Sequence, residues 1–127
     1  MKVLYVDDEP DIREIVEVAL SLDPAIDVRL CASGAEALRE LRGFAPDLIM
    51  LDVMMPGMDG PAVMSEIRKL PEFADTPIIF CTARTQTREA ERLRALGACD
   101  IVEKPFDPMR LAARLREIEA RHLRRPG

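Results

Sequence analysis

Apolar segments alternate with amphipathic segments five times along the chain. Each apolar segment has the length of a single strand, and the expected strands are Lys2 to Val6, Asp27 to Cys31, Asp47 to Leu51, Pro77 to Cys81 and Cys99 to Glu103. The first, third and fourth are almost continuously apolar, which is typical of parallel strands buried on both faces. The second and fifth include charged residues, which favours places at the edges of a sheet.

The segments between the strands have the spacing of amphipathic helices. The first helix is expected to bury one face, formed by Ile12, Ile15, Val16, Ala19 and Leu20. Ser33, followed three residues later by Glu36, predicts a capping box at the start of the second helix. That helix would bury Ala37, Leu38 and Leu41.

The last three helices are predicted from their ends as well as from their spacing. Gly60-Pro61 opens the third helix, and the fourth is expected from Thr85 to Leu96 with Gly97 just after its C-terminus. Asp107-Pro108 predicts the N-cap and the first residue of the fifth helix. The buried faces of the third and fifth helices are expected to contain Val63, Met64, Ile67, Leu111, Leu115 and Ile118.

This alternation predicts an α/β fold, a doubly wound parallel sheet of five strands flanked by five helices. With the second and fifth strands at the edges, the strand order is 2-1-3-4-5, an order already known from flavodoxin-like folds. The chain has 127 residues, enough for one domain with its own core. Because no repeat or linker interrupts the pattern, we expect a single domain over residues 1–127, with its core over about residues 2–122.

Composition narrows the environment of the protein. Hydrophobic residues make up 48% of the chain and charged residues 32%, as in soluble globular proteins. No apolar run approaches the ~18 residues of a membrane span. The first residues lead directly into a strand, which leaves no room for a signal peptide. We therefore expect a cytoplasmic protein that does not enter a membrane.

Charge and cysteine content bear on possible partners. The net charge of −5 argues mildly against direct binding of nucleic acid. The basic segment around His122 is expected to be a solvated helix end, where cations suit the helix dipole. Cys31, Cys81 and Cys99 lack metal-type spacing, so we expect small buried residues in a reducing compartment and no disulfide.

Five polar residues end the predicted strands or follow them directly: Asp7, Asp8, Asp52, Thr82 and Lys104. Because parallel strands present their carboxyl ends at one edge of a sheet, these side chains should converge although they lie far apart in sequence. Any one of them could simply cap a strand or begin a loop. Five at the same edge indicate a functional site.

Three carboxylates against one ammonium leave this edge short of positive charge. Two like charges ~4 Å apart repel by roughly 4 kcal/mol at an effective dielectric constant of about 20. A divalent cation would relieve the repulsion, and two or three carboxylates with room for water suit Mg²⁺ better than Ca²⁺. Carboxylate, metal, hydroxyl and ammonium are also the groups that phosphoryl transfer needs. Asp52 is the expected nucleophile because it lies on the central strand, between the acidic pair and the side of Thr82 and Lys104.

The chain resembles the receiver domain of two-component response regulators over essentially its whole length. The motifs that carry the resemblance are Val6-Asp7-Asp8-Glu9-Pro10, Pro46 to Asp52, Met55-Pro56-Gly57-Met58-Asp59-Gly60, Thr82-Ala83 and Lys104-Pro105-Phe106. Each motif is weak alone, but their order and intervals are highly specific. The resemblance implies a phosphorylation-activated signalling switch that catalyses only its own phosphorylation and dephosphorylation.

The resemblance also implies a role for each acidic residue. Asp52 would accept a phosphoryl group from a phosphohistidine on a sensor histidine kinase or a histidine phosphotransfer protein. Asp8, Asp52 and the backbone carbonyl of Met54 would bind Mg²⁺, while Asp7 would act directly or through a water molecule. Lys104, placed by a cis bond to the following proline, would contact the phosphoryl oxygens.

Thr82 is implied to turn toward the phosphoryl group, which replaces one carboxylate charge by roughly −1.5 to −2. The response is expected in the loop from Ala83 to Thr87 and on the face formed by the fourth helix, the fifth strand and the fifth helix, which would control a downstream protein. Many relatives have Tyr or Phe three residues before the lysine, where this chain has Ile101. Either the loop responds without an aromatic flip, or Ile101 is simply a half-buried edge-strand residue.

Met54 and Arg84 each lie two residues after a site residue and would border the phosphoryl group. An apolar Met54 should hinder the water that hydrolyses this group, which predicts a long-lived phosphoryl group. Arg84 would add positive charge or point to solvent. The apolar loop from Met55 to Met58 is expected to be exposed, where it contacts the kinase or covers the site. The single histidine, His122, is expected to be a solvated helix residue and not a phosphodonor.

Other functions fit parts of this pattern. An aspartyl-phosphate phosphohydrolase resembling the haloacid dehalogenase family needs a second Asp where this chain has Met54. A flavodoxin-like cofactor carrier needs Ser, Thr or Gly in its first loop, whereas the acidic Asp7-Asp8-Glu9 would repel phosphate. A degenerate receiver that serves only as a scaffold is disfavoured because every site residue is present.

The organisation of the whole protein has two open alternatives. We expect a stand-alone receiver that acts through protein contacts, as a monomer or a phosphorylation-dependent dimer. The alternative is a receiver excised from a larger regulator with a DNA-binding or enzymatic output.

Overall fold

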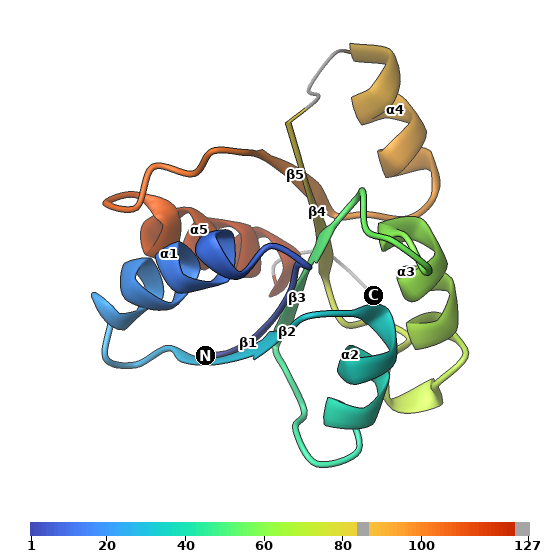
Figure 1. Cartoon of the computed structure of the whole chain (residues 1–127), viewed down its shortest axis with the longest axis horizontal. Coiled ribbons are helices and arrows are strands. Elements are labelled where there is room, and N and C mark those ends of the chain that lie inside the picture. The colour runs from blue at the N-terminus through green and yellow to red at the C-terminus, as the bar shows by residue number, and fades with distance from the viewer. Residues whose placement is uncertain (84–86, 124–127) are drawn as a thin grey trace.

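Residues 1–83 and 87–123, which the computed structural model describes, form a five-stranded parallel sheet with helices on both faces (Figure 1). The elements are β1 (Lys2–Val6), α1 (Pro10–Ser21), β2 (Asp27–Cys31), α2 (Gly34–Glu40), β3 (Leu48–Asp52), α3 (Gly60–Arg68), the 3₁₀ helix η1 (Pro71–Phe73), β4 (Ile78–Thr82), α4 (Thr87–Ala95), β5 (Asp100–Glu103) and α5 (Leu111–Leu123). The strand order is β2-β1-β3-β4-β5, so the predicted α/β fold and order are confirmed.

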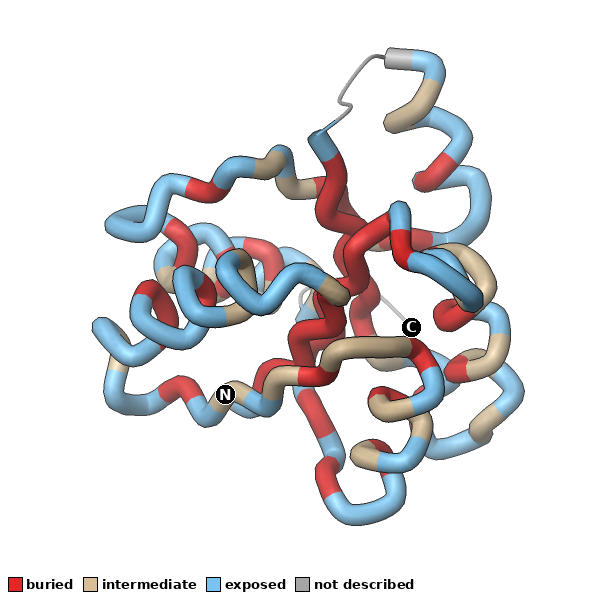
Figure 2. The backbone as a smooth tube through the Cα atoms, viewed as in Figure 1, coloured by how far each residue is buried: buried red, intermediate tan, exposed pale blue. Residues whose placement is uncertain are grey.

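Two apolar cores, one on each face of the sheet, hold these layers together. α1 and α5 cover one face, and α2, α3 and α4 cover the other (Figure 1). Every residue of β3 and β4 is buried, so the centre of the molecule is a continuous buried column in Figure 2. Successive strand residues alternate between the two cores, as Leu4 and Tyr5 do, and this requires nearly continuous apolar strands. Within the described residues, no helix is long and apolar enough to cross a membrane.

The predicted strands match the observed strands to within one residue at either end. The first and second agree at both ends. The third and fourth are displaced by one residue, so that they end at Asp52 and Thr82, and the fifth begins at Asp100 instead of Cys99. Two residues of the predicted site are therefore the last residues of central strands.

Side-chain caps begin α2 and α3. The hydroxyl of Ser33 accepts a hydrogen bond from the Glu36 N–H at 3.1 Å, as the capping box predicts. The Glu36 carboxylate accepts from the Ala32 N–H at 3.3 Å, one residue before the expected partner. Asp59 caps α3 by accepting from the Ala62 N–H at 2.9 Å.

The ends of α4 and α5 differ from the prediction. α5 begins at Leu111 and not at Pro108, because Asp107 caps a separate turn by accepting from the Met109 N–H at 3.0 Å. α4 is described from Thr87, and the start predicted at Thr85 lies outside the described residues. Gly97 follows α4 with a φ of +114°, a left-handed conformation that favours glycine, as predicted.

Two further features depart from the sequence pattern. Ile15 of α1 was expected in the core but is 41% exposed, because the buried stripe runs through Val16, Ala19 and Leu20. The 3₁₀ helix η1 was not predicted. It is held by Arg68, whose guanidinium donates to the backbone carbonyls of Phe73 and Thr76 at 2.8 and 2.7 Å.

β5 lies at the edge of the sheet, as its charged residues indicated, but the charge of Asp100 is buried. Asp100 is only 4% exposed, and its carboxylate lies 2.7 Å from Arg121, 3.3 Å from Arg114 and 3.4 Å from Arg94. Three arginines, from the helices that precede and follow β5 in the chain, surround this carboxylate.

Candidate functional site

The parallel register places the ends of β1 and β3 side by side. Val6 pairs with Leu51, and Asp52 pairs with Cys81 of β4. Because Asp7 follows Val6 directly, its side chain leaves β1 next to the last residue of β3. The convergence predicted for the carboxyl edge is present.

Lys104 connects the two strand ends. Its Nζ lies 3.0 Å from Asp7 Oδ2 and 3.2 Å from Asp52 Oδ1. A third carboxylate, that of Glu9, lies 3.7 Å away. The peptide bond between Lys104 and Pro105 is cis, as expected.

Asp7 is fully buried and its carboxylate is held by several donors. Oδ2 accepts from the Tyr5 hydroxyl at 2.7 Å as well as from Lys104, and Oδ1 accepts from the Glu9 N–H at 3.0 Å. Sequence reasoning missed Tyr5, because it lies inside an apolar strand and looks like a core residue. The only signal was a hydroxyl two residues before an acidic strand end.

Four carboxylates gather at this edge of the sheet. One oxygen from each of Asp7, Asp8, Glu9 and Asp52 lies within 4.8 Å of the others. Glu9 was not predicted, although it continues the acidic run that begins at Asp7. An all-oxygen donor set with partly exposed members fits Mg²⁺, which keeps several waters when it binds proteins.

Charge and burial oppose one another at the two central groups. Burial, together with the neighbouring charge of Asp7, raises the pKa of the Asp52 carboxyl to about 6, although Lys104 opposes this shift. Burial disfavours the charged form of Lys104, but the hydrogen bond to Asp7 and the charges of Asp7 and Asp52 outweigh it, so the pKa of Lys104 lies above its usual value. The site therefore has an unmet demand for positive charge.

Thr82 lines a cavity of about 590 Å³, to which Val53, the residue after Asp52, also contributes. The threonine is 5% exposed, and the cavity is also lined by Met54 from the loop after β3 and by Arg92 of α4. Met54 is 68% exposed. Arg84 lies outside the described residues.

The loop after β3 is less exposed than predicted. Met55 is only 8% exposed and packs in the core with α2 and α3, and Met58 is partly buried against the same core. A Cβ on Gly60 would lie 2.6 Å from the backbone oxygen of Asp52. The glycine is therefore required for the start of α3 to approach the end of β3.

Ile101 and His122 are more buried than their sequence contexts indicated. Ile101 is 9% exposed and belongs to the same core as Leu93 of α4, so it is not half-buried. His122 was expected to be solvated, but its Nε2 lies 3.1 Å from the Asp75 carbonyl oxygen and its Nδ1 is buried. Within the described residues, which include all three cysteines, no disulfide forms.

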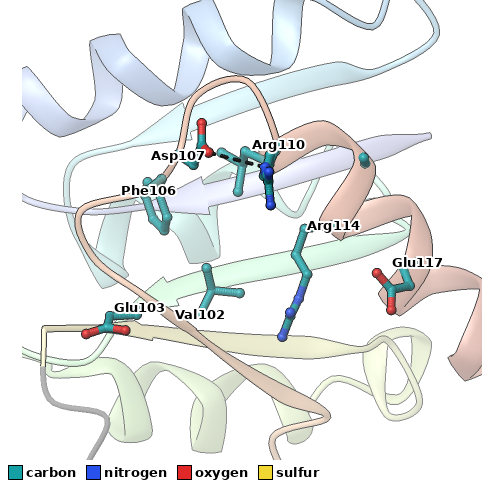
Figure 3. A pocket seen from close by; sticks show the side chains of 9 residues that line it. Val102, Glu103, Phe106, Asp107, Arg110, Arg114 and Glu117 are labelled. Carbon is teal, nitrogen blue, oxygen red and sulfur yellow. Dashed lines mark ion pairs between the residues drawn. The ribbon is translucent and has the colours of Figure 1, made fainter.

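A second cavity, of about 380 Å³, lies between β5 and the first turns of α5 (Figure 3). Its lining combines Val102 and Phe106 with the charged side chains of Glu103, Arg110 and Arg114. Figure 3 shows the ion pair between Arg110 and Asp107 at its rim. This face of the molecule presents apolar and charged groups together, as many protein-binding surfaces do.

Comparison with known proteins agrees with this geometry. The sequence profile of the response regulator receiver domain matches residues 3–116. Two curated relatives are a "Probable transcriptional regulator ycf27" of Porphyridium aerugineum, 42% identical over 92% of this chain and 47% of that protein, and the "Transcriptional regulatory protein TrcR" of Mycobacterium tuberculosis, 36% identical over 100% of this chain and 49% of that protein. This chain thus spans about half the length of the curated relatives that it matches.

Solved structures show the same similarity. The chemotaxis response regulator CheY4 of Vibrio cholerae superposes with a TM-score of 0.84 at 34% identity, covering 92% of this chain and 97% of that one. The receiver domain of NtrX from Brucella abortus superposes with a TM-score of 0.80 at 32% identity, covering 93% of this chain and 98% of that one.

Proposed function

Because the chain belongs to the response regulator receiver family, we propose that it is a switch whose Asp52 carboxylate accepts a phosphoryl group from a phosphohistidine of a partner protein. The observation that carries this proposal is the position of Lys104, which bridges Asp7 and Asp52 at 3.0 and 3.2 Å. A buried carboxylate beside a cation and a hydroxyl is suited to in-line phosphoryl transfer. One oxygen of Asp52 would bond to phosphorus as the bond between phosphorus and the histidine nitrogen breaks.

Asp8, Asp52 and the Met54 backbone carbonyl would hold Mg²⁺, with Asp7 acting directly or through water. When bound, Mg²⁺ supplies positive charge beside the acceptor oxygen. The protein's own side chains then have separate tasks. Lys104 would pair with the phosphoryl oxygens, and the Thr82 hydroxyl would donate a hydrogen bond to them.

The output of the switch would be a change at the loop after β4 and on the face of α4, β5 and α5. Ile101 is buried in the same core as Leu93 of α4. A shift of Thr82 toward the phosphoryl group would therefore be transmitted through packing and the backbone, not through an aromatic flip. The cavity of mixed character beside β5 would form part of the surface that a downstream protein contacts (Figure 3).

The biological setting follows from the same proposal. The donor would be a cytoplasmic histidine kinase or phosphotransfer protein, and the receiver would catalyse only its own phosphorylation and dephosphorylation. Its curated relatives carry the names of transcriptional regulators and are about twice as long. The whole protein would therefore have one of two forms. It would be a receiver joined to a DNA-binding output, or a stand-alone receiver that is a monomer or a phosphorylation-dependent dimer.

Intact mass measurement tests the acceptor and the metal together. The protein is incubated with Mg²⁺ and acetyl phosphate, and we expect the mass gain of one phosphoryl group. Asp52→Asn and excess chelator should each abolish the gain. The matched control is Asp27→Asn, which removes an exposed carboxylate at the first residue of β2, on the side of the sheet where the strands begin. This variant should gain the same mass as the wild type. A gain that persists in Asp52→Asn would refute the proposed acceptor.

A further inference from the structure

The single tyrosine of the chain donates a hydrogen bond into the acidic site from within the core. Tyr5 is fully buried in β1, and its hydroxyl oxygen lies 2.7 Å from Asp7 Oδ2. Its ring packs edge-on against Phe106, with the centroids 6.1 Å apart and the planes at 76°. Strand and ring packing together aim the hydroxyl at one carboxylate oxygen.

That oxygen is shared with Lys104. Asp7 Oδ2 accepts from the Tyr5 hydroxyl at 2.7 Å and from Lys104 Nζ at 3.0 Å. Under the proposed function, Lys104 turns toward the phosphoryl oxygens and weakens its contact with Asp7. A buried carboxylate oxygen without a donor is costly, so the lysine can turn easily only if another donor stays on Oδ2.

We propose that Tyr5 is a positioning residue of this site, whose hydroxyl keeps Asp7 Oδ2 hydrogen-bonded while Lys104 moves to the phosphoryl group. This inference rests on the proposed function. Without the hydroxyl, Asp7 would hold Lys104 back, because the departing ammonium would leave Oδ2 without a strong donor. Tyr5 touches neither the phosphoryl group nor the acceptor and acts through Asp7 and Lys104.

Deleting the hydroxyl alone tests the inference. Tyr5→Phe retains the ring and its contact with Phe106. The matched control is Val3→Ala, which weakens the same strand and the same core away from Asp7. Phosphorylation by acetyl phosphate is followed by intact mass over a series of Mg²⁺ concentrations.

We expect the maximal rate of Tyr5→Phe to fall by about tenfold, while the Mg²⁺ concentration for half-maximal rate does not rise. Val3→Ala should stay within about twofold of the wild type in both quantities. A merely structural role would instead loosen the acidic site and raise the Mg²⁺ requirement. Wild-type rates in Tyr5→Phe would overturn the inference alone, whereas a wild-type protein that gains no mass would overturn the proposed function and this inference together.

A double variant tests whether Tyr5 acts through the lysine. Tyr5→Phe should not slow phosphorylation further once Lys104→Met has removed the group that moves. If the two rate losses multiply, the two residues act independently and the inference fails.

The wild-type protein offers a measurement that requires no core substitution. Because the chain contains one tyrosine and no tryptophan, its tyrosine emission reports on Tyr5 alone. Phosphorylation should change this emission, because Asp7, which accepts the hydrogen bond of the Tyr5 hydroxyl, would no longer pair with the charge of Lys104. Emission that stays the same on full phosphorylation would contradict the proposal.

Discussion

Lys104 holds the central place in the acidic site, because its ammonium lies within reach of three carboxylates. The distances to Asp7, Asp52 and Glu9 are 3.0, 3.2 and 3.7 Å. A single ammonium cannot neutralise three negative charges, so the site retains a demand for a further cation. This imbalance suits a switch, because a new group that carries negative charge must compete for the same lysine.

Met54 is the residue that we expect to control how easily water reaches the proposed acceptor, Asp52. It lines a cavity together with Thr82 and is 68% exposed, so we expect it to act as a partial apolar screen beside Asp52. A polar side chain there would hydrogen-bond the attacking water. We expect Met54→Asn to shorten the lifetime of the phosphorylated protein by roughly threefold, a barrier change of about 0.7 kcal/mol.

The lifetime is measured from the loss of the phosphorylated mass after the phosphodonor is removed. Met109→Asn is the matched control, since Met109 is 79% exposed and lies in the turn before α5. An unchanged decay in Met54→Asn would show that this methionine does not screen the acyl phosphate.

At the scale of elements, ion pairs of Asp100 connect β5 to α4 and α5. Burial disfavours the ionised form of Asp100, but the Ile101 N–H, Arg121 and Arg114 outweigh it and hold the pKa of this carboxyl below its usual value. Arg94 of α4 contacts the same carboxylate at 3.4 Å. The face proposed as the output surface thus has a built-in link between α4, β5 and α5.

Removing one of these arginines should measurably lower the stability of the protein. The contact of Arg121 with Asp100 is 2.7 Å long and its carboxylate is only 6% exposed, so we expect Arg121→Ala to lower the free energy of unfolding by about 1 kcal/mol. Arg110→Ala serves as the control, because Arg110 and its partner Asp107 are 87% and 57% exposed. Urea denaturation compares the two. Equal stabilities would mean that the link is too well solvated to matter.

The elements that sequence predicts well are those governed by a single physical pattern. A strand that faces an apolar core on both sides must be continuously apolar. β1, β3 and β4 were therefore predicted to within one residue at either end. Features that depend on hydrogen bonds or ion pairs of particular side chains were missed. The 3₁₀ helix η1 needs Arg68, and the burial of Asp100 needs arginines from two helices.

The residues of the site also separate into those that the sequence pattern predicted and those that it missed. The parallel edge brings together Asp7, Asp8, Asp52 and Lys104 whatever the details of packing, so topology alone predicted them. Tyr5 and Glu9 join through the reach of individual side chains, which periodicity does not encode.

For the whole molecule, the consequence is that folding brings together carboxylates that repel one another. β1 and β3 cannot pair without placing Asp7 beside Asp52, so the stability of the two cores must offset this repulsion. Function and stability are therefore opposed at one edge of an otherwise apolar sheet. Removing a carboxylate should make the metal-free protein more stable while abolishing its proposed activity.

The pH dependence of unfolding tests this opposition. The pKa of Asp52 rises from 3.8 to about 6 on folding, so the folded state holds this proton more tightly than the unfolded chain does. The resulting stabilisation is complete below the ordinary pKa and is lost as the pH rises through about 6. In the presence of chelator at about pH 8, the free energy of unfolding of Asp52→Asn should therefore exceed that of the wild type by about 1 kcal/mol. This difference corresponds to roughly 3 °C in Tm. At about pH 5 the difference should shrink, because the wild-type carboxyl is then mostly protonated. A gain that is the same at both pH values would place the origin of the stabilisation in packing, and not in the charge of Asp52.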